Sequence, residues 1–102
     1  MERRSRHTAA LKVAILERMQ ITLKLFATLT DYLPDAARRD NQVALALPDG
    51  TTVGQAYAPF SLPDKLVHLV LVNGRYIAPE HRATHLLVDG DVLAIWPPIA
   101  GG

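Results

Sequence analysis

The sequence contains no cysteine. Disulfide bonds and thiolate metal sites are therefore excluded, and no side chain of this protein can carry sulfur. The sequence also lacks any apolar run long enough to span a membrane. Its 102 residues suffice for one domain with a modest core, which is too small to enclose an active site of its own.

Charged residues make up only 21% of the chain, and the hydrophobic share of 49% is that of an ordinary globular protein. The net charge of +1 is unevenly distributed. Residues 1–18 hold five basic and two acidic residues, whereas residues 19–102 hold six basic and eight acidic ones. The slightly acidic character of the second part argues against nucleic acid as a partner.

Residues 1–18 differ in character from the rest of the chain. Three arginines precede an apolar stretch that is short, is interrupted by Lys12 and lacks a small-residue cleavage site before Met19. A secretory signal peptide is therefore not favoured. We interpret residues 1–18 as a non-essential extension of a cytoplasmic protein, with an amphipathic targeting segment as the alternative.

The pattern of apolar residues predicts several strands and one helix. Residues 20–26 and 42–47 alternate between apolar and polar or small side chains, which predicts two paired, half-buried strands. Residues 48–50 form a turn, after which Thr51 or Thr52 can cap a helix of about two turns. Its buried stripe is predicted to consist of Val53, Ala56, Tyr57 and Phe60.

The second half of the chain predicts a hairpin and a final strand. Residues 68–72 are continuously apolar, and Asn73-Gly74 is a strong hairpin signal that leads into a short strand at residues 75–77. The turn Asp89-Gly90 precedes a last apolar strand at residues 92–96. Between the first hairpin and these strands, a right-handed crossover through the helix would return the chain beside its first strand.

The end of the chain is its most informative part. Pro97 and Pro98 terminate the last strand because neither has a backbone N–H to donate. Residues 99–102, Ile-Ala-Gly-Gly, then form a small extended tail. Glycines without a Cβ atom can enter a channel too narrow for other residues, and the group delivered there would be the carboxylate of Gly102.

This C-terminal pattern, from Asp89-Gly-Asp-Val to Pro-Pro-Ile-Ala-Gly-Gly, resembles that of the ThiS/MoaD-type ubiquitin-like sulfur carriers, and among them most closely the small subunits of molybdopterin synthase. The resemblance covers roughly residues 19–102. Together with the predicted elements it implies an α+β, β-grasp fold: a mixed sheet of four to five strands, one main helix on one face, and an extended tail. We expect the domain to comprise residues 19–98 and the tail residues 99–102.

The resemblance also implies a chemistry for the tail. In this family an E1-like adenylating enzyme consumes ATP to activate the C-terminal carboxylate, and a sulfur donor such as a cysteine desulfurase or a rhodanese converts it to a thiocarboxylate. The tail then enters the large subunit of molybdopterin synthase and passes sulfur to a pterin precursor. The carrier binds no cofactor and is not catalytic alone; it is the sulfur-carrying subunit of a complex.

Transferred to this sequence, Gly102 carries the adenylate and then the thiocarboxylate, while Gly101 and Ala100 permit channel entry. Trp96 and Ile99 are expected to contact partners, and Pro97 and Pro98 to set the direction of the tail as part of the same partner-binding segment. Two residues depart from the family pattern. Trp96 stands where phenylalanine is common, and Thr30 where a basic residue is common, and both positions lie where partners would dock, so the departures bear on partner identity and not on the carboxyl chemistry.

Three other functions fit the same features. Carriers for thiamine thiazole synthesis share the Gly-Gly end, but they usually lack Pro-Pro, which favours the molybdopterin branch. A ubiquitin-like modifier would be joined to lysines through Gly102. A β-grasp interaction module with an inert tail would tolerate the loss of that residue.

The remaining polar residues suggest no second site. His68, His81 and His85 lack the cysteine or carboxylate neighbours of a metal site. Asp89 and Asp91 flank a glycine, which indicates a turn rather than an acid–base pair.

One face of the sheet is expected to be open. The last strands offer apolar side chains on both faces, but the sequence supplies only one clear helix to cover them. The uncovered face, with Trp96 on it, is predicted to be a docking patch for partner proteins, with coverage by loops as the alternative.

Overall fold

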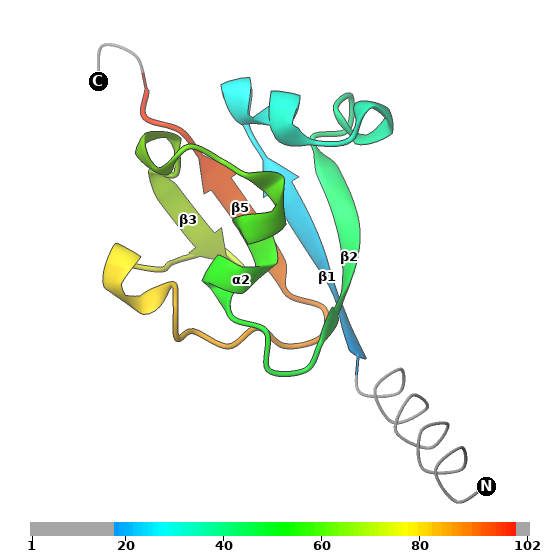
Figure 1. Ribbon diagram of the computed structural model, residues 1–102, viewed down its shortest axis with the longest axis vertical. Helices are drawn as coiled ribbons and strands as arrows, with labels where there is room; N and C mark the ends of the chain where they lie inside the picture. Colours follow the sequence, from blue (N-terminus) through cyan, green and yellow to red (C-terminus); the bar gives the residue numbers. More distant parts are fainter. Residues whose placement is uncertain (1–17, 100–102) are drawn as a thin grey trace, which may run out of the picture.

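The computed structural model describes residues 18–99 of the chain. A single five-stranded mixed sheet forms the body, with the strand order β2-β1-β5-β3-β4 (Figure 1). The strands are β1 (Arg18–Leu25), β2 (Gln42–Pro48), β3 (Leu69–Val72), β4 (Arg75–Tyr76) and β5 (Val92–Trp96). The described residues also form one α-helix, α2 (Val53–Tyr57), and five short 3-10 segments: η1 (Ala27–Tyr32), η2 (Asp35–Ala37), η3 (Ala58–Phe60), η4 (Asp64–Leu66) and η5 (Pro79–His81).

The centre of the sheet is a parallel pair flanked by antiparallel strands. β1 pairs in parallel with β5, and β2 and β3 run antiparallel to them on either side. The alternation that predicted the first strand places Ile21, Leu23 and Leu25 in the core. β1 begins at Arg18, two residues before the predicted start, because Met19 continues this buried row and is only 3% exposed.

Helix α2 is shorter than the sequence pattern suggested. Thr52 caps it by accepting from the backbone N–H of Gln55, whose side chain in turn accepts from the N–H of Thr52, which completes a capping box. Val53 and Ala56 are buried as predicted. Tyr57, the last residue of the helix, is partly buried. Phe60 lies in the 3-10 segment η3, beyond the end of the helix.

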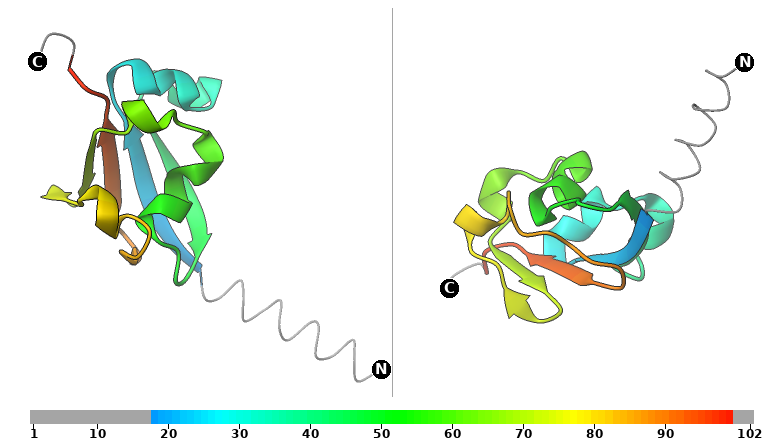
Figure 2. Two further views of the ribbon diagram at one scale, coloured as in Figure 1. Left: turned by 60° about the vertical axis from the view of Figure 1, so that its left-hand side comes forward. Right: turned by 90° about the horizontal axis from the view of Figure 1, so that it is seen from below.

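The molecule has two layers. The right-hand view of Figure 2 shows the helical segments gathered on one side of the sheet. The core lies between these segments and the inner face of the sheet, and includes Leu23, Leu93 and Ile95, all fully buried. The predicted α+β, β-grasp arrangement, with one main helix on one face, is confirmed. Within the described range, none of the helices has the length and apolarity that a bilayer-spanning segment requires.

The turns leading into β5 are held by aspartates. The Asn73-Gly74 hairpin forms as predicted, with both residues at positive φ. The Asn73 amide donates to Oδ1 of Asp91 at 2.8 Å, and the other oxygen of Asp91 accepts from the N–H of Val88. Asp89 accepts from the N–H of Gln20 on β1. These carboxylates therefore fix the start of β5 against its neighbours, which agrees with the predicted turn.

Candidate functional site

The site begins at the end of β5, where the chain leaves the sheet. The carbonyl of Ile95 accepts from the N–H of Phe26 at 3.2 Å, and the carbonyl of Trp96 accepts from the N–H of His68 at 3.1 Å. Pro97 follows, and because it has no N–H the ladder cannot continue. Pro97 is still buried, whereas Ile99 is 80% exposed. The chain is thus anchored up to Pro97 and projects into solvent directly after it.

Three of the predicted site residues, Ala100, Gly101 and Gly102, lie outside the described residues. Their roles in channel entry and in sulfur chemistry remain predictions. The other four, Trp96 to Ile99, are described and form the root of the tail. Because β5 is central and is held on both sides, this root has a fixed position relative to the body.

Trp96 is stacked on Phe26, the residue that follows β1. The two ring centroids are 3.9 Å apart and the ring planes differ by 3°. Leu93 and Ile95 face the core, so the alternation of β5 places Trp96 on the opposite face of the sheet, here called the outer face. Trp96 lies opposite Leu69 of β3, and both are half-buried. The indole is thus neither a core residue nor a free surface residue.

The outer face carries other apolar side chains. In the strand register, Ala94 lies beside Leu71, which lies beside Tyr76, and the tyrosine is 53% exposed. The helical segments lie on the other side of the sheet (Figure 2). The docking role predicted for this face stays a prediction, and the structure provides the apolar surface that it requires.

A groove runs along the root of the tail. It has a volume of about 290 Å³ and is lined by Ala27, Thr28, Trp96, Pro97, Pro98 and Ile99. One side of this groove is formed by the turn from β1 into η1. The chain turns sharply there because Ala27 adopts a positive φ of 54°. Thr30, at one of the two departures from the family pattern, donates its hydroxyl to the carbonyl of Ala27 at 3.0 Å and so supports this turn.

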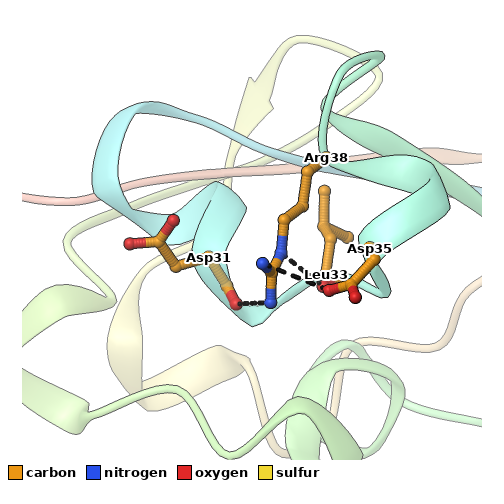
Figure 3. Close-up of polar contacts among 4 residues, drawn as sticks. All are labelled: Asp31, Leu33, Asp35 and Arg38. Atoms are coloured by element: carbon orange, nitrogen blue, oxygen red, sulfur yellow. Dashed lines mark hydrogen bonds and ion pairs between the residues drawn. The ribbon is translucent and has the colours of Figure 1, made fainter.

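Arg38 stabilises the segment that follows this turn. Its guanidinium donates to the backbone carbonyls of Leu33 and Asp31, at 3.1 and 3.0 Å, and pairs with the carboxylate of Asp35 at 3.2 Å (Figure 3). The ion pair is exposed and contributes little by itself. These contacts of Arg38 were not predicted from the sequence. The spacing of Asp35 and Arg38 is the only signal that could have suggested an ordered turn.

The histidines are not brought together as ligands. Within residues 18–99 no group of three or more histidine, aspartate or glutamate side chains could hold a metal ion. His81 and His85 are linked through the backbone, since the N–H of His85 donates to the carbonyl of His81. The described part positions the root of the tail and presents an apolar surface beside it.

Comparison with known structures places the fold among small ubiquitin-like proteins. The solution structure of the Haloferax volcanii HVO 2177 protein is 25% identical, with a TM-score of 0.65, and the match covers 84% of this chain and 89% of that one. The crystal structure of SAMP1 from Haloferax volcanii is 26% identical, with a TM-score of 0.60, over 81% of this chain and 99% of that one.

A third match shows the fold alone. The complex of subunits 1 and 2 of molybdopterin-converting factor from Helicobacter pylori contains a chain that is 18% identical, with a TM-score of 0.51, over 82% of this chain and all of that one. A comparison with curated proteins gave no match. The sequence model of the ThiS family matches residues 23–102, and since this range spans most of the sequence, the chain belongs to the ThiS family.

Proposed function

We propose that this protein is a sulfur carrier whose C-terminal Gly102 is converted to a thiocarboxylate and supplies sulfur for molybdopterin synthesis. The observation that carries the proposal is the rigid root of the tail. The last hydrogen bonds of the central strand end at Trp96, and three residues later Ile99 is 80% exposed. Ala100, Gly101 and Gly102 come next in the sequence, and because these residues are small, the tail is narrow where it leaves this fixed point.

The chemistry needs an activating partner. A carboxylate is a poor electrophile until its oxygen carries a good leaving group. In the proposed reaction the carboxylate of Gly102 attacks the α-phosphate of ATP in an E1-like adenylating enzyme, and pyrophosphate leaves. The terminal persulfide sulfur of a donor such as a cysteine desulfurase or a rhodanese then attacks the acyl carbon and displaces AMP. A second thiol of the donor cleaves the acyl disulfide so formed, which releases the thiocarboxylate and leaves a disulfide on the donor. The resulting thiocarboxylate is a nucleophile on a narrow arm.

The outer face and the groove supply the surface for these partners. Stacked aromatic rings and half-buried aliphatic side chains beside a projecting tail are the features of an interface core. The Helicobacter pylori structure, in which subunit 1 of molybdopterin-converting factor is complexed with subunit 2, supports a second subunit of that type as a partner. Pro97-Pro98 favours this pathway over thiamine thiazole synthesis, because the thiazole carriers that the chain resembles usually lack the pair.

A second function is favoured by one observation. Small archaeal modifier protein 1, SAMP1, is among the similar solved structures at 26% identity. A modifier would use the same adenylate of Gly102, but it would end as an amide with a lysine of a target protein. The two functions differ in the group that attacks the acyl-adenylate, so they differ in their products.

The deciding experiment is mass spectrometry of the intact protein after incubation with its adenylating enzyme, ATP and a sulfur donor. A carrier gains the mass difference between one sulfur and one oxygen atom, and the gain maps to the C-terminal peptide. A modifier yields target lysines joined to Gly102 by an isopeptide bond, and because Arg82 is the last basic residue, trypsin leaves residues 83–102 on each modified lysine. An unchanged C-terminal peptide under conditions in which the enzyme is active would contradict the carrier proposal.

A further inference from the structure

The two edges of the sheet are protected very differently. β4, at one edge, has only two residues, one of which is Arg75. β2, at the other edge, has seven, and it runs through a continuous register with β1 without a bulge. Residues 42–47 contain no charge and no proline. Short length, charge, proline and bulges are the devices that keep edge strands from pairing, and β2 has none of them before Pro48.

The backbone groups of β2 divide between its two sides. The carbonyl of Asn41 accepts from the N–H of Leu25 on β1 at 3.0 Å. In an antiparallel pair, the backbone groups of every second residue point to the same side. Val43, Leu45 and Leu47 therefore bond to β1. The N–H and C=O groups of Gln42, Ala44 and Ala46 point away from it, toward an edge that no strand of residues 18–99 occupies.

The order of small and large apolar side chains along β2 is the same in both directions from Leu45. Reading outward from this residue, Ala44 and Ala46 come first, and Val43 and Leu47 second. The alanines are exposed, and the three larger side chains are half-buried on the inner face. A two-fold interface requires a surface that complements itself, because each residue i that contacts j must also be contacted as j by i. This strand meets that requirement.

We propose that β2 of one copy pairs antiparallel with β2 of a second copy about a two-fold axis at Leu45. In this register Ala44 of each copy exchanges both backbone hydrogen bonds with Ala46 of the other. The two Leu45 side chains meet in a non-hydrogen-bonded pair, in which side chains approach most closely. The two sheets join into one, and the outward backbone groups of Ala44 and Ala46 in both copies are satisfied, whereas Gln42 lies opposite Pro48, which has no N–H to donate.

The charges at the ends of β2 favour a second copy over an unrelated peptide. The register places Asp49 of one copy opposite Asn41 of the other, at the turn that carries Arg38, Arg39 and Asp40. All four charged residues are exposed, and because Arg38 pairs with Asp35, Arg39 is the basic residue of this turn that can face Asp49. Opposite charges across neighbouring strands are stabilising, and here they would recur at both ends of the interface.

The pairing leaves the tails free. β1 lies between β2 and β5, so the end of β5 is not part of the proposed interface. Because the two copies run antiparallel, their tails leave from opposite ends of the joined sheet. Each copy can then present its tail to a separate partner, so dimerisation and sulfur loading are independent properties.

The test uses the full chain and measures its molar mass by light scattering over a wide range of concentrations. The native protein is expected to shift from monomer to dimer as concentration rises. The double variants Ala44→Lys with Ala46→Lys, and Ala44→Glu with Ala46→Glu, are each expected to stay monomeric, because like charges face one another across the axis. An equimolar mixture of the two should recover the dimer, since lysine then faces glutamate.

A matched control carries the same added charge away from β2. Ala83→Lys with Thr84→Lys changes two exposed residues after η5 and should dimerise like the native protein. A native chain that is monomeric at every concentration would overturn the proposal, whether the edge of β2 is covered by residues 1–17 or by a peptide of another protein. The proposal would also be overturned if the double lysine variant formed dimers on its own, or if the equimolar mixture of the lysine and glutamate variants stayed monomeric.

Discussion

The rings of Phe26 and Trp96 lie face to face, with centroids 3.9 Å apart, although the residues are separated by almost the whole domain in sequence. Phe26 directly follows β1 and Trp96 is the last residue of β5, and these strands pair in parallel, so their carboxyl ends meet at one end of the sheet. The stack therefore connects the start of η1 to the root of the tail. Through this contact, the position of Phe26 in the folded domain influences the direction in which the tail leaves it.

Trp96→Ala is expected to affect partner binding more than folding. The indole is half-buried, and its loss removes an aromatic stack worth about 1 kcal/mol together with some outer-face packing. Association with the adenylating enzyme should weaken by about 2 kcal/mol or more if the indole is an anchor of the interface. A binding titration beside a thermal unfolding curve measures both effects.

Leu86→Ala is the control for this substitution, because Leu86 is 59% exposed and lies in the loop before β5, away from the root of the tail. It should change neither binding nor stability appreciably. A loss of about 3–5 kcal/mol of stability for Trp96→Ala with unaltered binding would show instead that the indole is a core residue.

Arg82→Met should destabilise the fold without touching the tail. Arg82 is buried at 8% exposure, and its guanidinium donates to three backbone carbonyls, those of Ile77, Val67 and His68. Removing the donors leaves carbonyls unsatisfied and should lower the free energy of unfolding by about 3 kcal/mol. Denaturant unfolding measures this loss, and the exposed Arg75→Met is the control. Equal stability of the two variants would contradict the structural role given to Arg82.

Removal of residues 1–18 is expected to be neutral. The chain beginning at Met19 retains the buried row of β1 and loses only Arg18, whose partner Pro48 lies at the end of β2. Stability should change by less than about 0.5 kcal/mol, as for surface changes generally. The rate of sulfur loading should also be unchanged. A loss of several kcal/mol, or of loading, would show that the extension belongs to the functional protein.

The first two strands could be predicted from the sequence because their side chains alternate with a period of two against a buried face, and β2 has nearly the predicted bounds for this reason. β5 was predicted from a continuous apolar run that ends at Pro97, and the Asn73-Gly74 hairpin follows from local turn chemistry. The tail could be singled out because proline and glycine have conformational effects that do not depend on the rest of the fold.

The contacts that sequence reasoning missed are those in which a long side chain reaches backbone carbonyls. Neither Arg38 nor Arg82 was given a role from the sequence, yet each donates to carbonyls at least five residues away. Such bonds depend on the path of the chain and leave no periodic signal. The positive φ of Ala27 could not be predicted either, because alanine, unlike glycine, has no preference for left-handed turns that a sequence pattern would reveal.

The last prediction concerns the length of the tail, since the proposed function requires the reactive carboxyl at a fixed distance from Trp96. Deleting Gly102 leaves the carboxyl one residue short of the site in the adenylating enzyme, and adding a residue after Gly102 places it one residue too far. Misplacement on this scale should reduce the rate of thiocarboxylate formation about a hundredfold or more, measured as the appearance of the sulfur-for-oxygen mass gain. Thermal unfolding should be unchanged in both variants, because the described ladder ends at Trp96 and the altered residue lies beyond it. The matched control is Leu86→Ala, which leaves the tail length intact and should be loaded at the native rate. If the shortened and lengthened chains are loaded as fast as the native one, Gly102 is not the sulfur-bearing residue and the carrier proposal fails.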